Sequence, residues 1–262
     1  LGGRVLRESA LPGLNEWRRV LDWRITQLKK MKNVAMYPSS PMTVEDILES
    51  GAQNIILATG ATWRRDGVGR TLWKPIPGCE TENVFTPDDI MESNGLPLGI
   101  RKQIPGFQVV IYDDDHYYMG GVLAELLAGQ GCQVSLVTPA PMVSYWSQFT
   151  LEQERIQHTL MKLGVKLFTR TVLSEIQAGF VRLSNTVSGE EIELPRDGVV
   201  LVSDRTPNDS LYPALIPALI IPEGGSRRER GIQSLKIIGD AEAPNIIAQA
   251  VFAGHLAARE FD

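Results

Sequence analysis

Two segments of this sequence end in small or acidic residues directly after an apolar run, which is the pattern of a ligand-binding strand end. The first ends in Ala58-Thr59-Gly60 and the second in Gly239-Asp240. A bulky side chain there would keep a ligand away from the backbone, and open α/β sheets bind ligands at the carboxyl ends of their strands. Either glycine alone could simply terminate its strand, but the two together predict a nucleotide-binding site.

Asp240 has two interpretations, which the sequence leaves open. It stands just before a helix that we expect over 245–261, and the positive end of a helix dipole favours a phosphate. Its carboxylate could accept hydrogen bonds from ribose hydroxyls, or it could cap the free N–H groups of the helix. Pro244 suits the first turn of this helix, where its missing N–H is harmless.

A third segment has the secondary-structure pattern of a dinucleotide-binding site, but its loop lacks two of the three glycines that such a site usually has. A strand, a helix and a second strand over 108–137 make a βαβ unit, which is typical of a parallel sheet. The loop of such a unit usually carries Gly-x-Gly-x-x-Gly, but here Asp115 and Tyr117 replace the first two glycines and only Gly120 remains. Carboxylates in this loop would repel a pyrophosphate. We therefore expect no NAD(P)H binding.

Other chemistry at this loop has weaker support. Asp113, Asp114 and Asp115 could suggest a metal site, but adjacent strand residues point to opposite faces, so the carboxylates would not converge. His116 could titrate near neutrality, but no nucleophile is near it in the sequence, which favours a polar loop residue over a catalytic base. The aromatic residues around the loop are Tyr112, Tyr117, Tyr118, Tyr145 and Trp146. They either fill the vacated cleft as core residues or form a surface for an electron-carrier protein.

The pattern along the chain predicts an α/β protein. Apolar residues at helical spacing predict helices, and short apolar runs bounded by turn residues predict strands. The helices are expected over 14–31, 43–50, 121–130, 151–163 and 245–261, with a short one from Thr86. The strands are expected over 33–37, 54–60, 108–112, 133–137, 165–169, 180–184, 191–194, 198–202 and 235–240. Residues 63–82 are rich in Gly and Pro and are expected to form a connecting loop.

The composition limits the classes of function. With 262 residues, 43% of them hydrophobic and 22% charged, the chain is neither disordered nor fibrous. Its net charge of -5 argues against binding to nucleic acid, and no apolar run reaches the ~20 residues of a membrane span. Cys79 and Cys132 are too few for an iron–sulfur cluster or a structural zinc site. They fit a reducing compartment, so we expect a cytoplasmic protein.

Several short motifs carry a resemblance to a known family. Leu1-Gly2-Gly3-Arg4 and the two strand ends look like three landmarks of flavoproteins with two dinucleotide-binding domains. The motifs that are more specific are Leu11-Pro12-Gly13-Leu14, Pro41-Met42-Thr43, Ala58-Thr59-Gly60-Ala61-Thr62-Trp63, Pro75-Ile76-Pro77-Gly78 and Gly239-Asp240-Ala241-Glu242-Ala243-Pro244. They resemble the C-terminal region of the trimethylamine dehydrogenase family, which includes dimethylamine and histamine dehydrogenases and N-demethylases of methylated amino acids. The resemblance covers nearly the whole chain.

The resemblance implies a fold of two Rossmann-like, nucleotide-binding lobes. The first would be an FAD/ADP-binding-like lobe, discontinuous over 1–103 plus 231–262, and it would lack its first βαβ glycine loop, which should stand before Leu1. The second would be a degenerate NAD(P)-binding-like lobe over 104–230. An ADP or FAD-type nucleotide would then occupy a partial site. The residues carried over to that site are Gly2, Gly3, Ala58, Thr59, Gly60, Gly239 and Asp240.

The resemblance also implies a larger protein. In that family an N-terminal barrel of the same polypeptide carries covalent FMN and a [4Fe–4S] cluster, so no catalytic residue is expected in this chain. The parent would oxidise a C–N bond of an amine and pass electrons to an electron-transfer flavoprotein, and we expect a homo-oligomer. A different reading is a scaffold subunit with a vestigial nucleotide fold that only binds partners.

Overall fold

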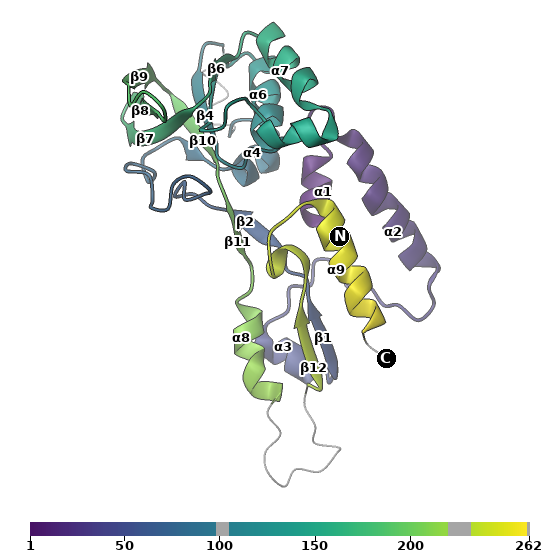
Figure 1. Cartoon of the computed structure of the whole chain (residues 1–262). Helices are drawn as coiled ribbons and strands as arrows, with labels where there is room; N and C mark the ends of the chain where they lie inside the picture. The colour runs from purple at the N-terminus through teal and green to yellow at the C-terminus, as the bar shows by residue number, and fades with distance from the viewer. Residues whose placement is uncertain (98–104, 220–231, 261–262) are drawn as a thin grey trace. The chain divides into compact units, whose positions relative to one another are not determined.

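The computed structural model describes residues 1–97, 105–219 and 232–260. The chain forms two compact units (Figure 1). The first unit comprises Leu1–Arg4, Leu21–Thr62 and Arg205–Asp262, and the second comprises Val5–Val20 and Trp63–Asp204. The domain limits expected from the sequence refer to nucleotide-binding lobes, which this grouping does not test, so they remain a prediction.

The second unit is built on a parallel sheet. Within the described residues this sheet has five strands in the order β3-β10-β4-β5-β6. Their bounds are Val84–Phe85 for β3, Gly198–Val202 for β10, Gln108–Asp113 for β4, Gln133–Val137 for β5 and Lys166–Phe168 for β6. All five residues of β10 are buried, as expected for the interior strand of a sheet covered on both faces. The predicted α/β class and βαβ unit are confirmed.

Helices cover one face of this parallel sheet. They are α4 (Pro87–Ser93), α6 (Met119–Gly129) and α7 (Gln153–Lys162), and the 3-10 helix η2 (Tyr145–Thr150) precedes α7. Because side chains alternate along a strand, Val109 and Ile111 of β4 join the core under the helices. Val110 and Tyr112 join the core on the opposite face. The sheet is therefore the middle layer of the second unit (Figure 1).

An antiparallel sheet covers the other face. It consists of β7 (Thr171–Gln177), β8 (Phe180–Asn185) and β9 (Glu191–Pro195) in that order. The strands expected over 180–184 and 191–194 correspond to β8 and β9, which pair antiparallel as a hairpin. Strand β7 was not predicted, although its buried positions alternate before a register shift between Leu173 and Glu175. The shift interrupts the period of two that would identify the strand.

The first unit has a much smaller sheet. Among its described residues, β1 (Asn54–Leu57) and β12 (Ser234–Ile237) form a two-stranded parallel sheet. A small core of Ile47, Leu57, Leu215 and Ile232 joins the sheet to the helices α3 (Val44–Glu49) and α8 (Leu211–Leu215). The 3-10 helix η3 (Ile216–Leu219) follows α8.

Three further helices and a second small sheet belong to the described chain. Helix α2 (Arg18–Lys30) follows the 3-10 turn η1 (Asn15–Trp17), helix α9 (Ile247–Arg259) ends the described chain, and α1 (Gly3–Glu8) begins it. Strands β2 (Ala61–Trp63) and β11 (Arg205–Pro207) pair in a second small sheet. Among the described residues, none of the helices combines the length and the apolar character needed to cross a lipid bilayer.

Two local predictions are wrong. Residues 33–37 form no strand and are exposed, because no described strand lies beside them to complete a sheet. Helix α9 begins at Ile247 rather than at 245, so Pro244 precedes the helix instead of occupying its first turn. Ile246 before the helix and Ala250 within it are exposed, whereas Ile247 and Ala257 are buried.

Candidate functional site

The predicted strand ends lie side by side in the first unit. Strands β1 and β12 run parallel with Leu57 opposite Ile237, and the N–H of Ile238 donates to the carbonyl of Leu57 over 2.9 Å. The segments that follow both strands therefore leave the sheet at the same edge. This edge is the carboxyl end, where an open α/β sheet binds its ligands.

The turn Ala58-Thr59-Gly60 is held by Asn208, which follows β11. The Thr59 hydroxyl donates to the Asn208 carbonyl over 2.5 Å, and the Asn208 side-chain amide donates to the Thr59 carbonyl over 3.2 Å. The Asn208 N–H donates to the Gly60 carbonyl over 2.9 Å. Gly60 has a φ of +78°, and apart from its neighbours no described atom lies within 4 Å of the position that a Cβ would take. The turn is therefore fixed in place but open on the side of Gly60.

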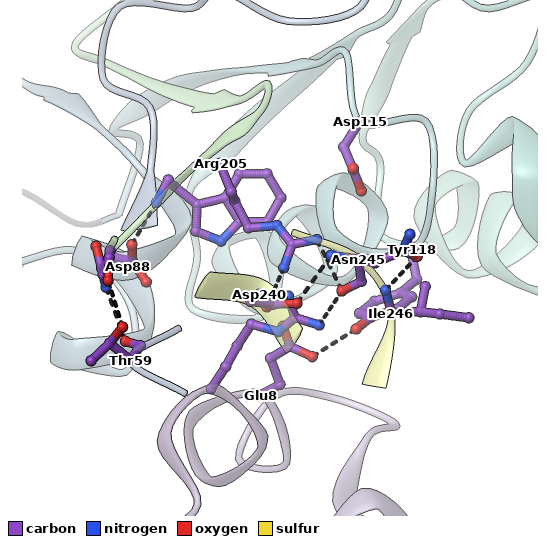
Figure 2. Close-up of polar contacts among 12 residues, drawn as sticks. Glu8, Thr59, Asp88, Asp115, Tyr118, Arg205, Asp240, Asn245 and Ile246 are labelled. Carbon is purple, nitrogen blue, oxygen red and sulfur yellow. Dashed lines mark hydrogen bonds and ion pairs between the residues drawn. The ribbon is translucent and has the colours of Figure 1, made fainter. Parts of the chain in front are cut away.

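The second strand end is held by two arginines. Gly239 has a φ of +62° and begins the 3-10 helix η4 (Gly239–Ala241), which contains Asp240. Asp240 Oδ2 accepts a hydrogen bond from Arg4 Nη1 over 2.6 Å. The same oxygen accepts one from Arg205 Nη1 over 2.8 Å (Figure 2). The Nη2 atoms of the same two arginines donate to the Asn245 carbonyl over 2.9 and 3.1 Å, respectively. Asp240 Oδ1 accepts from the Asn245 N–H over 3.0 Å.

These contacts bear on the two interpretations of Asp240. The residue at the N-cap position of α9 is Ile246, which provides no side-chain cap, and Asp240 bonds Asn245 outside the helix. The helix-cap interpretation is therefore wrong for α9. The contact with a ribose stays a prediction. We call the set Arg4, Arg205, Asp240 and Asn245 the arginine clasp.

Gly2 and Gly3 differ in the space that surrounds the position a Cβ would take. Gly2 has a φ of +101°, and a Cβ on it would lie 2.4 Å from Cδ2 of Leu21, which belongs to the same unit. Close packing against the first turns of α2 accounts for Gly2 without a ligand. Gly3 has a φ of +41° and open space where a Cβ would lie. Their role in nucleotide binding stays a prediction.

Sequence reasoning missed four residues that build this edge. Arg4 was noticed only as part of a motif, and Arg205, Asn208 and Asn245 were not singled out. Arg205 is the first residue of the short strand β11 and Asn208 follows its last, and the three residues of this strand show no pattern. Each acts on a partner far away in the sequence, so only the tertiary structure reveals the contact.

In the second unit, the last residue of β4 has a buried carboxyl group. Asp113 is fully buried, and its Oδ1 accepts from the His116 N–H over 3.0 Å. No hydrogen-bond donor of the described residues reaches its Oδ2. Burial, with a contribution from the charge of Asp115, raises the pKa of Asp113 to about 7. A Cβ on Gly120 would lie 2.6 Å from Cγ of Asp113, so the glycine that remains of the pattern makes room for this carboxyl group.

The neighbouring aspartates have separate partners. Asp114 accepts from the Thr71 N–H over 2.8 Å and from its hydroxyl over 2.7 Å, and His116 Nε2 lies 3.2 Å from its Oδ1. Burial alone would raise the pKa of Asp114, but the bonds from His116 and Thr71 together lower it. Asp115 lies 3.8 Å from Arg70. The part of the chain that the structure describes contains no group of three or more His, Cys, Asp or Glu side chains arranged to hold a metal.

The aromatic residues of this loop divide between core and surface. Tyr112 is fully buried. The rings of Tyr117 and Tyr118 meet edge to face with centroids 4.7 Å apart, and the Tyr118 hydroxyl donates to Glu8 over 2.6 Å (Figure 2). Trp146 is 39% exposed and lies under the guanidinium of Arg70, 4.2 Å from the ring centroid. Tyr112 thus packs as a core residue, and the surface role of the others stays a prediction.

Comparisons with known proteins agree with the motifs. Residues 85–210 match the family described as the OYE-like second alpha/beta domain. A dimethylamine dehydrogenase from Hyphomicrobium sp. (strain x) is 35% identical over 288 residues, which cover 100% of this chain and 37% of the relative. The structure of histamine dehydrogenase from Rhizobium sp. 4-9 matches with a TM-score of 0.91 and 44% identity, over 100% of this chain and 39% of that one.

These matches confirm the resemblance to the trimethylamine dehydrogenase family. A further structure, 6-hydroxypseudooxynicotine amine oxidase from Pseudomonas geniculata N1, matches with a TM-score of 0.89 and 38% identity, over 99% of this chain and 36% of that one. The chain therefore spans little more than a third of the length of these relatives. Thioredoxin reductase from T. acidophilum, at 18% identity and a TM-score of 0.54, shows the same Rossmann-like α/β fold.

Proposed function

We propose that this chain is the C-terminal, nucleotide-fold portion of a flavin-dependent oxidoreductase that acts on amines. The parent would be an amine dehydrogenase or N-demethylase that oxidises a C–N bond and passes electrons to an electron-transfer flavoprotein. The similarity along the whole chain to proteins named as amine dehydrogenases and an amine oxidase supports this proposal.

Within the parent, this chain would bind an ADP or FAD-type nucleotide rather than carry out the redox chemistry. The observation that carries this role is the shared carboxyl edge of β1 and β12. There the open side of Gly60 lies on one strand end and the polar groups of the arginine clasp lie on the other. A nucleotide needs close approach to the backbone, and the open side of Gly60 supports this part of the proposal. Thr59, Gly60, Gly239 and Asp240 would hold it.

The redox groups would belong to another part of the parent. FMN and a [4Fe–4S] cluster supply the electron-transfer chemistry in this proposal. Cys79 and Cys132 cannot supply the four thiolates that such a cluster takes. NAD(P)H is not proposed as a ligand, because the loop over 113–117 presents carboxylates where a pyrophosphate would lie.

The first unit supports the proposal that a glycine-loop βαβ unit completes this discontinuous lobe. Parallel sheets are normally covered on both faces and have more than two strands. Here Ile56 of β1 is 39% exposed, and Phe252 and Leu256 of α9 are exposed as well. An added strand and helix would cover such apolar surface.

The partners that we propose are the N-terminal barrel of the same polypeptide, the electron-transfer flavoprotein and further copies in a cytoplasmic homo-oligomer.

The test is nucleotide binding by the full-length protein. We expect ADP to bind the full-length protein in calorimetry and to bind the isolated chain weakly or not at all, since the glycine loop is missing from it. Gly60→Val should abolish binding because it fills the open side of the turn. Gly51→Val is the matched control, since Gly51 lies in the same unit with a φ of +67° and open space around it.

Two outcomes would contradict the proposal. If ADP binds the Gly60→Val variant as tightly as the unaltered protein, the nucleotide site lies elsewhere. If the natural gene product is colourless and no longer than this chain, the scaffold alternative is favoured. In that case flavin and cluster absorbance would be absent, and no amine would be oxidised.

A further inference from the structure

A small cavity of the second unit lies beside the residues that link β4 to α6. Its volume is about 50 Å³. One water needs about 10–15 Å³ of such space, so the cavity has room for about three to five heavy atoms. Its lining residues all belong to the second unit. Apart from apolar residues and glycines, it is lined by three aromatic and three charged side chains, which are Trp17, Tyr117, Tyr118, Glu125, Glu152 and Arg155.

The aromatic residues give the cavity walls that attract positive charge. The rings of Tyr117 and Tyr118 meet at 62° with centroids 4.7 Å apart, so they form two differently oriented walls. The Tyr118 hydroxyl donates to Glu8, which is 1% exposed, and this hydrogen bond holds the ring in place (Figure 2). Trp17 belongs to the 3-10 turn η1 and is 40% exposed. The faces of aromatic rings carry negative charge and bind cations.

The charged side chains of the cavity leave an excess of negative charge. Glu152 has a partner, since its Oε1 lies 3.6 Å from Nη2 of Arg155, whose side chain is 62% exposed. Glu125 of α6 is partly buried, and no cation among the described residues pairs with its carboxylate. Burial raises the pKa of Tyr117, and the charges of Glu152 and Asp115 raise it further. The cavity therefore favours a positively charged occupant.

We propose that this cavity binds a small organic ammonium ion, with the carboxylate of Glu125 as its counter-ion and the three aromatic rings as its walls. An alkylated ammonium ion suits the site better than a metal ion does. Its methyl groups can pack against the rings, and it loses less hydration than a small inorganic cation on leaving water. The inference does not rest on the proposed function, because none of these residues belongs to the proposed nucleotide site.

The experiment is a calorimetric titration of the full-length protein with tetramethylammonium. This ion matches the size of the cavity and has no lone pair on nitrogen, so an amine-oxidising site does not consume it. We expect a dissociation constant of about 0.1–10 mM, the range that so small a ligand can reach. tert-Butanol, a neutral molecule of similar size, should bind much more weakly. Tetraethylammonium should also bind much more weakly because it is too large, and sodium ions should not compete.

Two variants and two matched controls assign the binding to this cavity. Glu125→Gln keeps the shape of the side chain and removes its charge, so it should weaken tetramethylammonium binding by about 5- to 20-fold. Tyr117→Leu removes one aromatic wall and should weaken it by about 3- to 10-fold. The controls are Glu154→Gln and Phe149→Leu, which change exposed residues of the same unit outside the cavity and should leave the affinity unchanged.

The outcomes distinguish this site from other places where the ion could bind. If tetramethylammonium also occupies a site of amine oxidation, the titration shows two sites, and Glu125→Gln should weaken only one of them. An affinity that Glu125→Gln leaves unchanged would overturn the inference, even if Tyr117→Leu does not fold. Equal binding of tert-butanol would overturn it too, because the cavity would then select for shape alone. If the full-length protein binds no tetramethylammonium, the inference is wrong, whether or not the protein oxidises amines.

Discussion

The two units differ in how completely their sheets are covered. In the second unit, Ile111 of β4 and every residue of β10 are buried between a helical layer and an antiparallel sheet. In the first unit, β1 and β12 form a two-stranded sheet over a small core, and Ile56 is 39% exposed. The second unit has the packed layers of an α/β domain, whereas the first leaves apolar side chains of its described sheet partly exposed.

The groups that could bind a nucleotide lie in the unit whose sheet is less completely covered. The second unit has the complete βαβ unit, but its loop contains the buried carboxyl groups of Asp113 and Asp114. The first unit has the less complete sheet, but its strand ends carry the open turn at Gly60 and the arginine clasp. A complete nucleotide fold is therefore no guide to which unit binds a nucleotide, because the side chains at the strand ends decide this.

The largest expected effect comes from removing a core side chain of the second unit. Ile111→Ala should lower the free energy of unfolding of that unit by about 2–5 kcal/mol, because it leaves a cavity in a fully packed core. The matched substitution in the first unit, Ile56→Ala, should cost less than about 1 kcal/mol in the isolated chain, since this side chain is partly in water already. Hydrogen exchange of the β4 and β1 amides measures both effects.

This pair of variants also tests whether β1 becomes buried in the full-length protein. If further structure covers the first unit, Ile56→Ala should cost clearly more there than in the isolated chain. An equally small effect in both would mean that β1 keeps its exposed face, and the difference between the two units would then be a permanent feature of the protein.

A smaller effect is expected from the buried carboxyl group of the second unit. The pKa of Asp113 is about 7 in the folded chain against a usual value of 3.8. Between these values the folded state keeps a proton that the unfolded state has lost, so this group's contribution to stability falls as the pH rises from about 4 to 7 and is lost above 7. Asp113→Asn should remove this fall and raise the free energy of unfolding by about 1–3 kcal/mol at pH 8.

The control for this variant removes a charge from the surface of the same unit. Glu154→Gln lies on an exposed position of α7 and should leave the pH profile unchanged. Asp114 acts in the opposite direction and below pH ~4, since its pKa is lowered. Denaturant titrations between pH 5 and 8 would contradict the assignment if Asp113→Asn and the unaltered chain lost stability in parallel.

Much of the fold follows from local patterns, but not its irregular parts. The βαβ unit was predictable because β4 and α6 are long, apolar and separated by a recognisable loop. Helix α3 was predictable from its capping box, in which Thr43 and Asp46 bond each other's backbone. Residues 33–37 looked like a strand by composition, yet a strand exists only where another strand lies beside it. That partner is a tertiary property.

In the candidate site, too, the residues with a local sequence pattern were predictable and those fixed by tertiary contacts were not. The turn at Gly60 and the strand end at Gly239 were predictable, since glycine after an apolar run marks a close approach of the backbone. Arg205, Asn208 and Asn245 were not, because each has a partner far away in the sequence: Asp240 for Arg205, Thr59 for Asn208 and Arg4 for Asn245. The sequence also gives no sign that Asp240 bonds two arginines, a contact that makes it part of the clasp.

The smallest expected effect is an absence of nicotinamide binding by the second unit. Titration of the full-length protein with NADH or NADPH should give no saturable reduction of the flavin that we propose for it. Restoring glycine at both Asp115 and Tyr117 should still give no tight binding. The reason is that Asp113 and Asp114 stay in place, and their carboxyl groups are held under the loop by His116 and Thr71 rather than displaced into solvent.

This prediction separates two explanations of why the loop does not accept a dinucleotide. If bulk were the obstacle, the double glycine variant would bind NADH at micromolar concentrations. If charge at the strand end is the obstacle, affinity should appear only when Asp113 and Asp114 are replaced as well, since the lowered pKa of Asp114 keeps that residue charged, and it should then depend on salt. Rapid reduction of the flavin in the unaltered protein would contradict both explanations, and it would mean that the carboxylates around Gly120 do not prevent a pyrophosphate from binding.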